Sequence, residues 1–225
     1  MGFWNSELWK PGSDGPSLQH SLKALIKMVH YLYSKFILEK IYHIKIPINQ
    51  HYFEPDYSDL YNIFSIVMKR KPKISLEVGS GYSTYIISEA LKILRKKDGI
   101  SRELYCLEQK EKYLKVVKNY QNLGSSNFIK FIKISLKTNN YLGKKVSMCS
   151  NFPNSEINFF YEDRTDHKDT SIAGDALLIE EKMPEDYAIC IDGMIDTVGF
   201  YKNNLKRKYK ISGRGFHGVN FIPSH

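Results

Sequence analysis

The sequence predicts an α/β fold built around a mostly parallel β-sheet. Five short apolar runs have the length and the composition of strands. These runs lie at 74–78, 104–107, 128–135, 157–161 and 187–191. Segments with helical periodicity separate the first three runs, and a β-α-β-α-β series is typical of parallel strands joined by right-handed crossovers. The glycine-punctuated tail at 210–223 predicts a terminal antiparallel hairpin.

Apolar residues at steps of three and four predict the helices between and around these strands. The predicted helices cover 17–42, 60–69, 85–94, 110–121, 173–182 and 198–209. The Lys71-Pro72 step ends the second helix, because the residue before a proline is disfavoured in helical geometry. Residues 136–155 are rich in Asn, Gly, Lys and Ser, and we expect them to form a loop.

Residues 1–72 predict a helical extension or cap that precedes the sheet domain of residues 73–225. Leu22, Leu25 and Val29 belong to an apolar stripe along the first helix. We expect this stripe to pack on the body of the protein. Two alternatives stay open: a homodimer contact through the N-terminal helices, and a helix that lies on a membrane surface.

The composition is that of a globular protein. The chain has 225 residues, 42% of them hydrophobic and 25% charged, and these values exclude global disorder. Cys106, Cys149 and Cys190 are too few and too scattered for a disulfide framework or a zinc site, so we expect buried thiols and a cytoplasmic location. We expect neither a signal peptide nor a membrane span, since no apolar run approaches about 18 residues.

The charge balance is basic, with 33 Lys and Arg against 24 Asp and Glu and a net charge of +9. Such a charge could attract nucleic acid, a membrane surface or an anionic small substrate, or it could follow from a general abundance of lysine. The runs at 69–71 and 95–97 fall at the ends of predicted helices, where lysine favours the helix dipole without any partner. Nucleic acid therefore ranks below a small-molecule substrate as the partner.

A glycine-containing segment joins the first predicted strand to the helix that follows it, and it reads Glu77-Val78-Gly79-Ser80-Gly81. Glycines let the backbone turn sharply and approach a ligand closely. The start of the next helix offers unpaired N–H groups and the positive end of a dipole. Open α/β sheets bind ligands at this edge, so the segment is a candidate ligand-binding loop.

Glu108 closes the second predicted strand, at the same edge of the sheet. A carboxylate at this position can accept hydrogen bonds from both hydroxyls of a ribose. The alternative is that Glu108 only caps the helix that opens immediately after it.

Together these residues resemble the class I S-adenosylmethionine-dependent methyltransferase family. The resemblance covers about 73–223 and rests on Glu77, the Gly79-x-Gly81 loop and Glu108. It implies a Rossmann-like, mostly parallel sheet of about seven strands with an antiparallel C-terminal hairpin, and S-adenosylmethionine as the cofactor. It also implies that Glu77 and the two glycines take the family's role against the methionine part of the cofactor, while Glu108 holds the ribose hydroxyls.

The rest of the loop adds further cofactor-binding candidates by the same resemblance. Ser83 stands where many members of the family have a third glycine, and Ser83 and Thr84 could supply hydroxyl contacts. Ser80 and Tyr82 complete the candidate set. The segment from Gly79 to Thr84 looks more like the corresponding loop of these methyltransferases than like that of dehydrogenases.

The segment after the fourth predicted strand holds the catalytic candidates, because in this family it faces the transferred methyl group. Asp163 could act as a general base, Arg164 could clamp an anionic group, and His167 could be a base near neutral pH. Many relatives have a Gly-Pro or Pro-Pro step after the aspartate, and this chain departs from that pattern. The alternative for each residue is a solvated, charged loop. Asp192, after the fifth strand, either shapes the substrate pocket or caps the next helix.

The resemblance implies methyl transfer from S-adenosylmethionine to a small-molecule or sugar-like acceptor. The N-terminal helices would cover the substrate mouth or build a dimer contact. The alternatives are a binding or assembly protein that kept the fold and lost catalysis, and an RNA methyltransferase. The sequence has no G-x-x-x-x-G-K-[ST] loop, which argues against a P-loop nucleotidase. It has no metal-ligating cluster either, so we expect no resident metal, and the alternative is a divalent ion held by Asp163 and Asp192.

Overall fold

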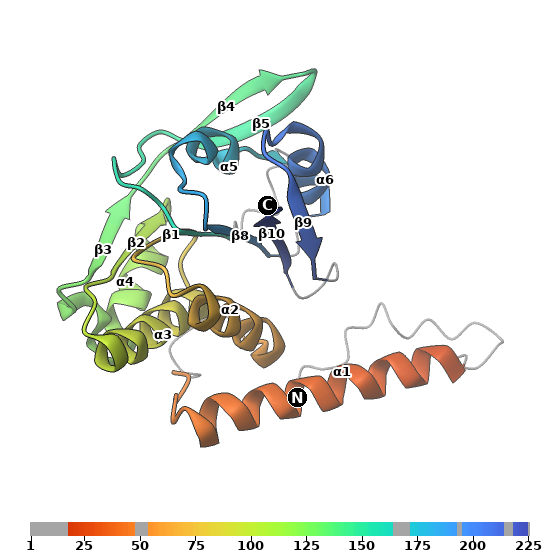
Figure 1. The fold of residues 1–225 in the computed structure, drawn as a ribbon, viewed down its shortest axis with the longest axis vertical. Coiled ribbons are helices and arrows are strands. Elements are labelled where there is room, and N and C mark those ends of the chain that lie inside the picture. The colour runs from red at the N-terminus through yellow and green to blue at the C-terminus, as the bar shows by residue number, and fades with distance from the viewer. Residues whose placement is uncertain (1–17, 48–53, 164–171, 193–194, 214–217, 225) are drawn as a thin grey trace.

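The computed structural model describes residues 18–47, 54–163, 172–192, 195–213 and 218–224, and its central element is a twisted seven-stranded sheet (Figure 1). In the order in which they pair, the strands are β3 (Ile129–Lys133), β2 (Glu103–Glu108), β1 (Ile74–Val78), β6 (Phe159–Glu162), β8 (Ala188–Ile191), β10 (Val219–Pro223) and β9 (Tyr209–Ser212). The first five are parallel, and β10 runs antiparallel to both of its neighbours. The predicted sheet and its C-terminal hairpin are confirmed.

Helices pack on one face of this sheet, and a mixed layer packs on the other (Figure 1). The first layer contains α2 (Tyr57–Arg70), α3 (Tyr82–Asp98) and α4 (Glu111–Asn119), followed by a 3₁₀ turn at Tyr120–Ser125. The second layer contains α5 (Asp175–Ile179), a 3₁₀ turn at Glu180–Lys182, α6 (Ile195–Asn204) and a small sheet. Each face buries its own apolar cluster, and the three cysteines are buried free thiols, as predicted.

The small sheet corrects the predicted loop at 136–155. It contains the hairpin of β4 (Leu136–Tyr141) and β5 (Lys144–Cys149), and β5 pairs with the short β7 (Ile172–Ala173). Leu142 and Gly143 join the hairpin with positive φ angles of 49° and 75°, as a tight two-residue turn requires. The side chains of β4 are largely exposed, so this strand lacks the apolar alternation that marks a half-buried strand.

The last helix is shorter than predicted, because α6 ends at Asn204 and not near 209. The buried carboxylate of Glu180 accepts hydrogen bonds from the backbone N–H groups of Lys206 and Arg207, at 2.8 and 2.9 Å. It also accepts one from the hydroxyl of Tyr209, at 2.6 Å. These bonds hold the chain in a non-helical path that leads directly into β9.

The N-terminal part begins with α1 (Leu18–Phe36) and a π-helical turn at Ile37–Ile41, which lie outside the helical layer and beside α2 (Figure 1). Ser34 and Leu38 are fully buried, and the ring of Tyr31 meets that of Tyr57 edge-on at 5.3 Å. The expectation that the apolar stripe packs on the body is wrong, because the stripe is exposed. Among the described residues, the structure has no helix that is long and apolar enough to cross a membrane.

Candidate functional site

The glycine loop lies where β1, β2 and β6 end together. The N–H of Gly79 donates to the carbonyl oxygen of Leu107 at 2.9 Å, and the N–H of Asp163 donates to that of Val78 at 2.9 Å. Gly79 has a φ angle of +98°, and a Cβ at this position would lie 1.7 Å from the carbonyl oxygen of Asp163. Only glycine therefore fits where the loop passes the end of β6. The sharp turn is the one that the sequence predicted, whereas a close approach to a ligand stays a prediction.

The first turn of α3 closes the loop through hydroxyl groups. The N–H of Gly81 donates to the hydroxyl oxygen of Thr84 at 3.1 Å, which satisfies one of the free donors at a helix start. The hydroxyl of Ser83 donates to Oε1 of Glu77 at 2.5 Å. The ring of Tyr82 is mostly buried and stacks on that of Tyr120, with the centroids 5.8 Å apart. These three side chains brace the loop, and their contact with a cofactor stays a prediction.

Glu77 is buried beneath the loop with no exposed surface. Burial raises the pKa of its carboxyl group to about 8, although hydrogen bonds from Ser83 and Thr84 oppose this shift. Its second oxygen, Oε2, has no hydrogen-bond partner. A buried oxygen without a partner is costly, so Glu77 favours its protonated form near neutral pH.

This burial predicts how stability depends on pH. The folded-state pKa of about 8 exceeds the ordinary value, so Glu77 contributes stability at low pH that is lost as the pH rises through 8. We expect Glu77→Gln, which keeps the shape of the protonated acid, to reduce the loss of unfolding free energy between about pH 6 and pH 9 by about 2–3 kcal/mol. Urea unfolding at both pH values measures this difference. An unchanged pH dependence in the variant would contradict the assignment.

Glu108 is buried at the end of β2, and both of its carboxylate oxygens accept hydrogen bonds. The hydroxyl of Ser80 donates to one oxygen at 2.8 Å, and the N–H of Lys110 donates to the other at 2.7 Å. The second bond is the helix-opening contact that the sequence left open as the alternative role. The first bond ties Glu108 to the glycine loop, so the carboxylate is held in a fixed position at the ligand-binding edge.

Asp163 follows β6 directly, and its carboxyl group belongs to an acidic cluster. Burial, together with the nearby charges of Asp192 and Glu108, raises its pKa to about 7. Asp192 follows β8, with its N–H bonded to the carbonyl oxygen of Glu162 at 3.0 Å. Two parallel strands therefore bring these two aspartates to one edge, and a pKa near neutrality suits a general base. Arg164 and His167, the other catalytic candidates, lie outside the described residues.

Asp59, in the first turns of α2, is a residue that the sequence reasoning did not assign to the site. Burial and the charges of Asp56, Asp192 and Asp163 raise the pKa of Asp59 to about 8. Because α2 also contacts β8, these charges indicate that Asp59 lies on the side of the edge where β6 and β8 end. Its only sequence signal was its place in a predicted helix start. In the part of the chain that the structure describes, no His, Cys, Asp or Glu side chains form a group of three or more arranged to hold a metal ion.

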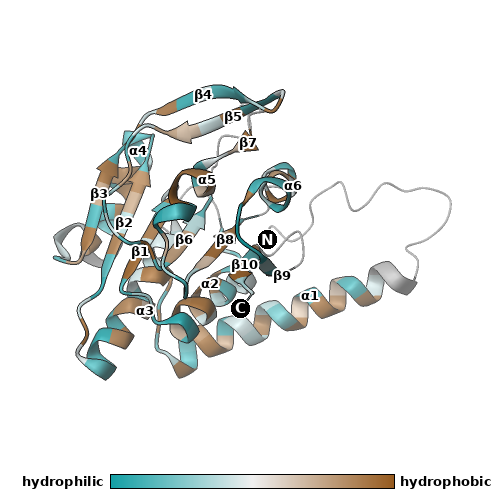
Figure 2. Cartoon of the chain, turned by 45° about the horizontal axis from the view of Figure 1, so that its top comes forward, coloured by the Kyte–Doolittle hydropathy of each residue, from teal (hydrophilic) through white to brown (hydrophobic). Residues whose placement is uncertain are grey.

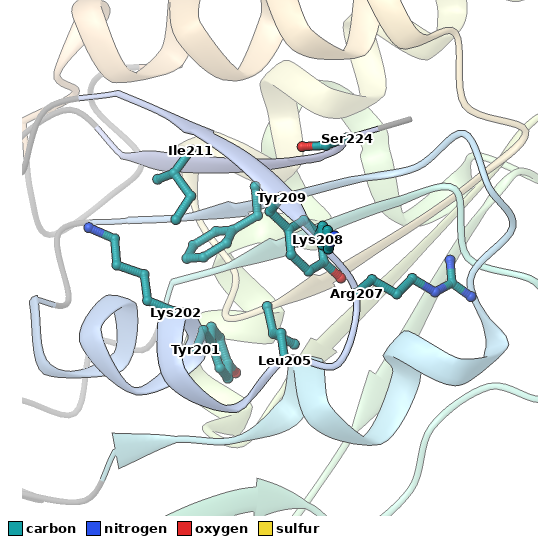
Figure 3. A pocket seen from close by; sticks show the side chains of 9 residues that line it. Tyr201, Lys202, Leu205, Arg207, Lys208, Tyr209, Ile211 and Ser224 are labelled. Atoms are coloured by element: carbon teal, nitrogen blue, oxygen red, sulfur yellow. The ribbon is translucent and has the colours of Figure 1, made fainter.

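A separate groove of about 430 Å³ lies between α6 and the strands β9 and β10 (Figure 3). Aromatic and aliphatic side chains line it together with the cationic residues Lys202, Arg207 and Lys208. The guanidinium of Arg207 is bonded to the carbonyl oxygens of Met183 and Pro184. None of the predicted site residues that the structure describes lines this groove. It is therefore distinct from the candidate site.

Comparison with known proteins places this arrangement in a known fold. No protein-family model and no curated protein sequence matches the chain. A Podospora anserina methyltransferase solved with bound SAH (S-adenosylhomocysteine) has a TM-score of 0.54 and 12% identity, covering 95% of this chain and 100% of its own. An O-methyltransferase from Bacillus cereus in complex with SAH has a TM-score of 0.51 and 10% identity, covering 87% and 99%.

A methyltransferase from Geobacter sulfurreducens has a TM-score of 0.50 and 10% identity, and the match covers 92% of this chain and 100% of that one. Identities this low establish the fold and nothing finer. The alternation of strands and helices, the seven-strand order and the antiparallel C-terminal pair agree with that fold. The chain has the fold of the class I S-adenosylmethionine-dependent methyltransferases.

Proposed function

We propose that the protein binds S-adenosylmethionine and transfers its methyl group to a small-molecule acceptor. One observation carries the proposal: the hydroxyl of Ser80 in the glycine loop is bonded to the buried carboxylate of Glu108 at 2.8 Å. This bond joins the two parts of the site that the resemblance assigns to the methionine part and to the ribose of one cofactor. Fold neighbours solved with SAH support the choice of cofactor.

The residues present fit this cofactor in shape and chemistry. Gly79 lets the loop turn tightly against the backbone of Asp163, which holds the loop at the edge where the parallel strands end. Glu108 has acceptor oxygens suited to ribose hydroxyls, with the hydroxyl of Ser80 beside them. The bound cofactor would supply an electrophilic methyl group.

Asp163 is the residue that we propose to receive a proton from the acceptor. It follows β6 directly, and its own carbonyl oxygen is the atom that Gly79 approaches. Its pKa of about 7 leaves a substantial ionised fraction at neutral pH. An ionised Asp163 would accept the proton of an acceptor hydroxyl as the nucleophile attacks. Most of the remaining rate enhancement would come from holding the acceptor in line with the methyl group.

The acidic surroundings indicate the class of acceptor. Asp59, Asp163 and Asp192 place three carboxyl groups around the proposed acceptor side. Burial, together with neighbouring carboxylates that include Asp192, raises the pKa of Asp59 and of Asp163. Such a cluster disfavours an anionic acceptor. It suits a neutral compound with several hydroxyls, such as a sugar-like molecule, which can donate hydrogen bonds to carboxylates. Because Asp59 belongs to α2, the N-terminal extension would form one wall of this site.

Replacement of Glu108 tests the cofactor assignment. We expect Glu108→Ala to weaken the binding of S-adenosylhomocysteine by about 10- to 100-fold, because hydrogen bonds to a charged group contribute about 1.5–3 kcal/mol. Isothermal titration calorimetry measures the change in Kd. The matched control is Glu103→Ala, since Glu103 begins the same strand and pairs with Lys130 at the opposite edge.

The control should leave the Kd unchanged within about twofold, as expected for a surface ion pair. Equal affinities in the Glu108 and Glu103 variants would reject the ribose assignment. If the wild type binds neither S-adenosylmethionine nor S-adenosylhomocysteine, the proposed function fails. If it binds the cofactor but methylates none of a panel of hydroxyl-bearing acceptors, the binding-protein alternative gains support.

A further inference from the structure

The apolar stripe of α1 is an exposed feature of the described residues that the proposed function does not use. Its side chains are between 51% and 58% exposed. The stripe consists of Leu22, Leu25, Ile26, Val29, Leu32 and Phe36. These residues recur at three- and four-residue steps, so they form one continuous band along the helix, and Figure 2 shows the hydrophobic colouring that recurs along α1. Contiguous apolar surface of this kind usually marks an interaction site.

Most of the apolar face of α1 points away from the body of the protein. α1 meets α2 through Tyr31, whose ring contacts Tyr57, and beside the stripe through Tyr33, whose ring contacts Tyr61 at 5.9 Å. Ser34 is fully buried, and so is Leu38 in the π-helical turn that follows α1. At about 100° per residue, Leu25 lies about 180° around the helix from the buried Ser34. All side chains at 21–30 are exposed, and the first half of α1 projects past the body (Figure 1). Within the part of the chain that the structure describes, a flat partner could therefore reach the stripe without meeting the body of the protein.

The charges of α1 are all of one sign. Lys23, Lys27 and Lys35 lie on the helix, and no acidic residue occurs from Leu18 to Phe36. Lys40 and Lys45 follow the helix, as does Glu39, whose carboxylate accepts a hydrogen bond from the hydroxyl of Tyr57 at 2.7 Å. The lysines fall beside and behind the stripe when the positions are placed at about 100° per residue. A basic amphipathic helix with a continuous apolar face is the pattern of helices that lie in the interface of an anionic membrane.

We propose that α1 is a peripheral membrane anchor, which inserts its apolar stripe among the acyl chains of an anionic lipid surface while its lysines contact the headgroups. The whole chain carries a net charge of +9, which favours the same surface. The positive charge of α1 argues against a second copy of the protein as the partner that covers the stripe. A second α1 would bring more lysines and no carboxylate, whereas helix pairs are commonly matched by opposite charges beside the apolar seam.

Vesicle co-sedimentation of the full chain tests the anchor. The probes are phosphatidylcholine vesicles with about one third phosphatidylserine and vesicles of phosphatidylcholine alone. We expect the protein to bind the anionic vesicles, and to bind the neutral ones at least about fivefold more weakly, since each lysine near the surface contributes about 1 kcal/mol. High salt should weaken the binding, because it screens these charges.

A pair of variants separates the stripe from simple charge attraction. Val29→Glu places a charge in the stripe, and Ala24→Glu places the same charge on an exposed position about 140° away from Val29. We expect Val29→Glu to reduce vesicle binding at least about tenfold more than Ala24→Glu does, because only the first substitution disrupts apolar burial. Both residues are exposed, so neither variant should alter folding, which circular dichroism and cofactor titration check.

Several results would overturn the anchor. Failure of the wild type to bind anionic vesicles contradicts it, and so does equal binding by the two variants. If light scattering shows a wild-type dimer that Val29→Glu dissociates, and vesicles are not bound, the stripe is a contact between two copies. Vesicle binding is measured without cofactor or acceptor. The anchor and the proposed methyl transfer can therefore fail independently.

Discussion

Gly79→Ala is expected to abolish binding of S-adenosylhomocysteine and to lower the free energy of unfolding by about 3 kcal/mol or more. The added Cβ would lie 1.7 Å from the carbonyl oxygen of Asp163, and the φ angle of +98° is strained for any L side chain. The blocking atom belongs to the backbone, and the pairing of β1 with β6 holds it in place. To relieve this clash, the loop or the end of β6 would have to move, and both belong to the candidate site.

Gly99→Ala is the matched control for this prediction. Gly99 also has a positive φ angle, +72°, but no heavy atom lies within 4 Å of the position that its Cβ would take. The Gly99→Ala substitution should lower the free energy of unfolding by about 1 kcal/mol, through backbone strain alone, and leave cofactor binding unchanged. Urea unfolding and calorimetric titration of both variants make the comparison. If the two variants lose similar unfolding free energy and both still bind S-adenosylhomocysteine, the close approach of Gly79 to Asp163 contributes neither to stability nor to cofactor binding.

The parts of the fold that the sequence predicted depend on local patterns. The strands β1 and β2 are short apolar runs, and Glu108 ends the second of them, so their positions follow from nearby residues alone. Parallel pairing then brings the ends of both strands to one edge, which is why the Gly79 loop and Glu108 could be placed together in advance. Their measured contact runs through Ser80, and the sequence offered no signal for that particular bond.

The errors in the prediction come from tertiary contacts. The strand β4 was missed because its side chains face solvent and its pattern is polar, although the turn at Leu142-Gly143 was a usable signal. The predicted end of α6 was wrong because Glu180, far away in the sequence, binds the backbone near Lys206. Asp59 was not assigned to the site for the same reason. Asp163 and Asp192, which lie near it, follow strands about 100 or more residues later in the chain, and local sequence patterns do not indicate such distant contacts.

The exposed stripe of α1 was misjudged for a different physical reason. Periodicity identifies an apolar face, but it does not say which surface covers that face. The small side chain of Ser34 allows α1 to approach α2 through the opposite face, where Leu38 and Tyr31 supply the remaining contact. The burial of Ser34 was the missing information, and a serine between apolar residues gives no local sign that it is buried.

Asp163→Asn is expected to lower kcat by about 10²- to 10⁴-fold, which is the usual contribution of a general base. In the wild type, the base acts in its ionised form, so the rate should rise with pH through about 7 and then level off. The measurement is methyl transfer from radiolabelled S-adenosylmethionine to the best acceptor of a hydroxyl-bearing panel. The variant should retain cofactor affinity and lose the rise near pH 7.

Asp192→Asn and Asp186→Asn show whether that rise belongs to Asp163. The charge of Asp192 helps to raise the pKa of Asp163, so its removal should lower that pKa and move the rise in rate to lower pH. Asp186 is exposed and pairs with Arg70 at the other edge of the sheet, so its replacement should change neither kcat nor the profile. If the rise in rate stays at the same pH in Asp192→Asn, or persists in Asp163→Asn, the group that accepts the acceptor's proton is not Asp163. If the rise moves to lower pH in Asp192→Asn and disappears in Asp163→Asn, that group is Asp163.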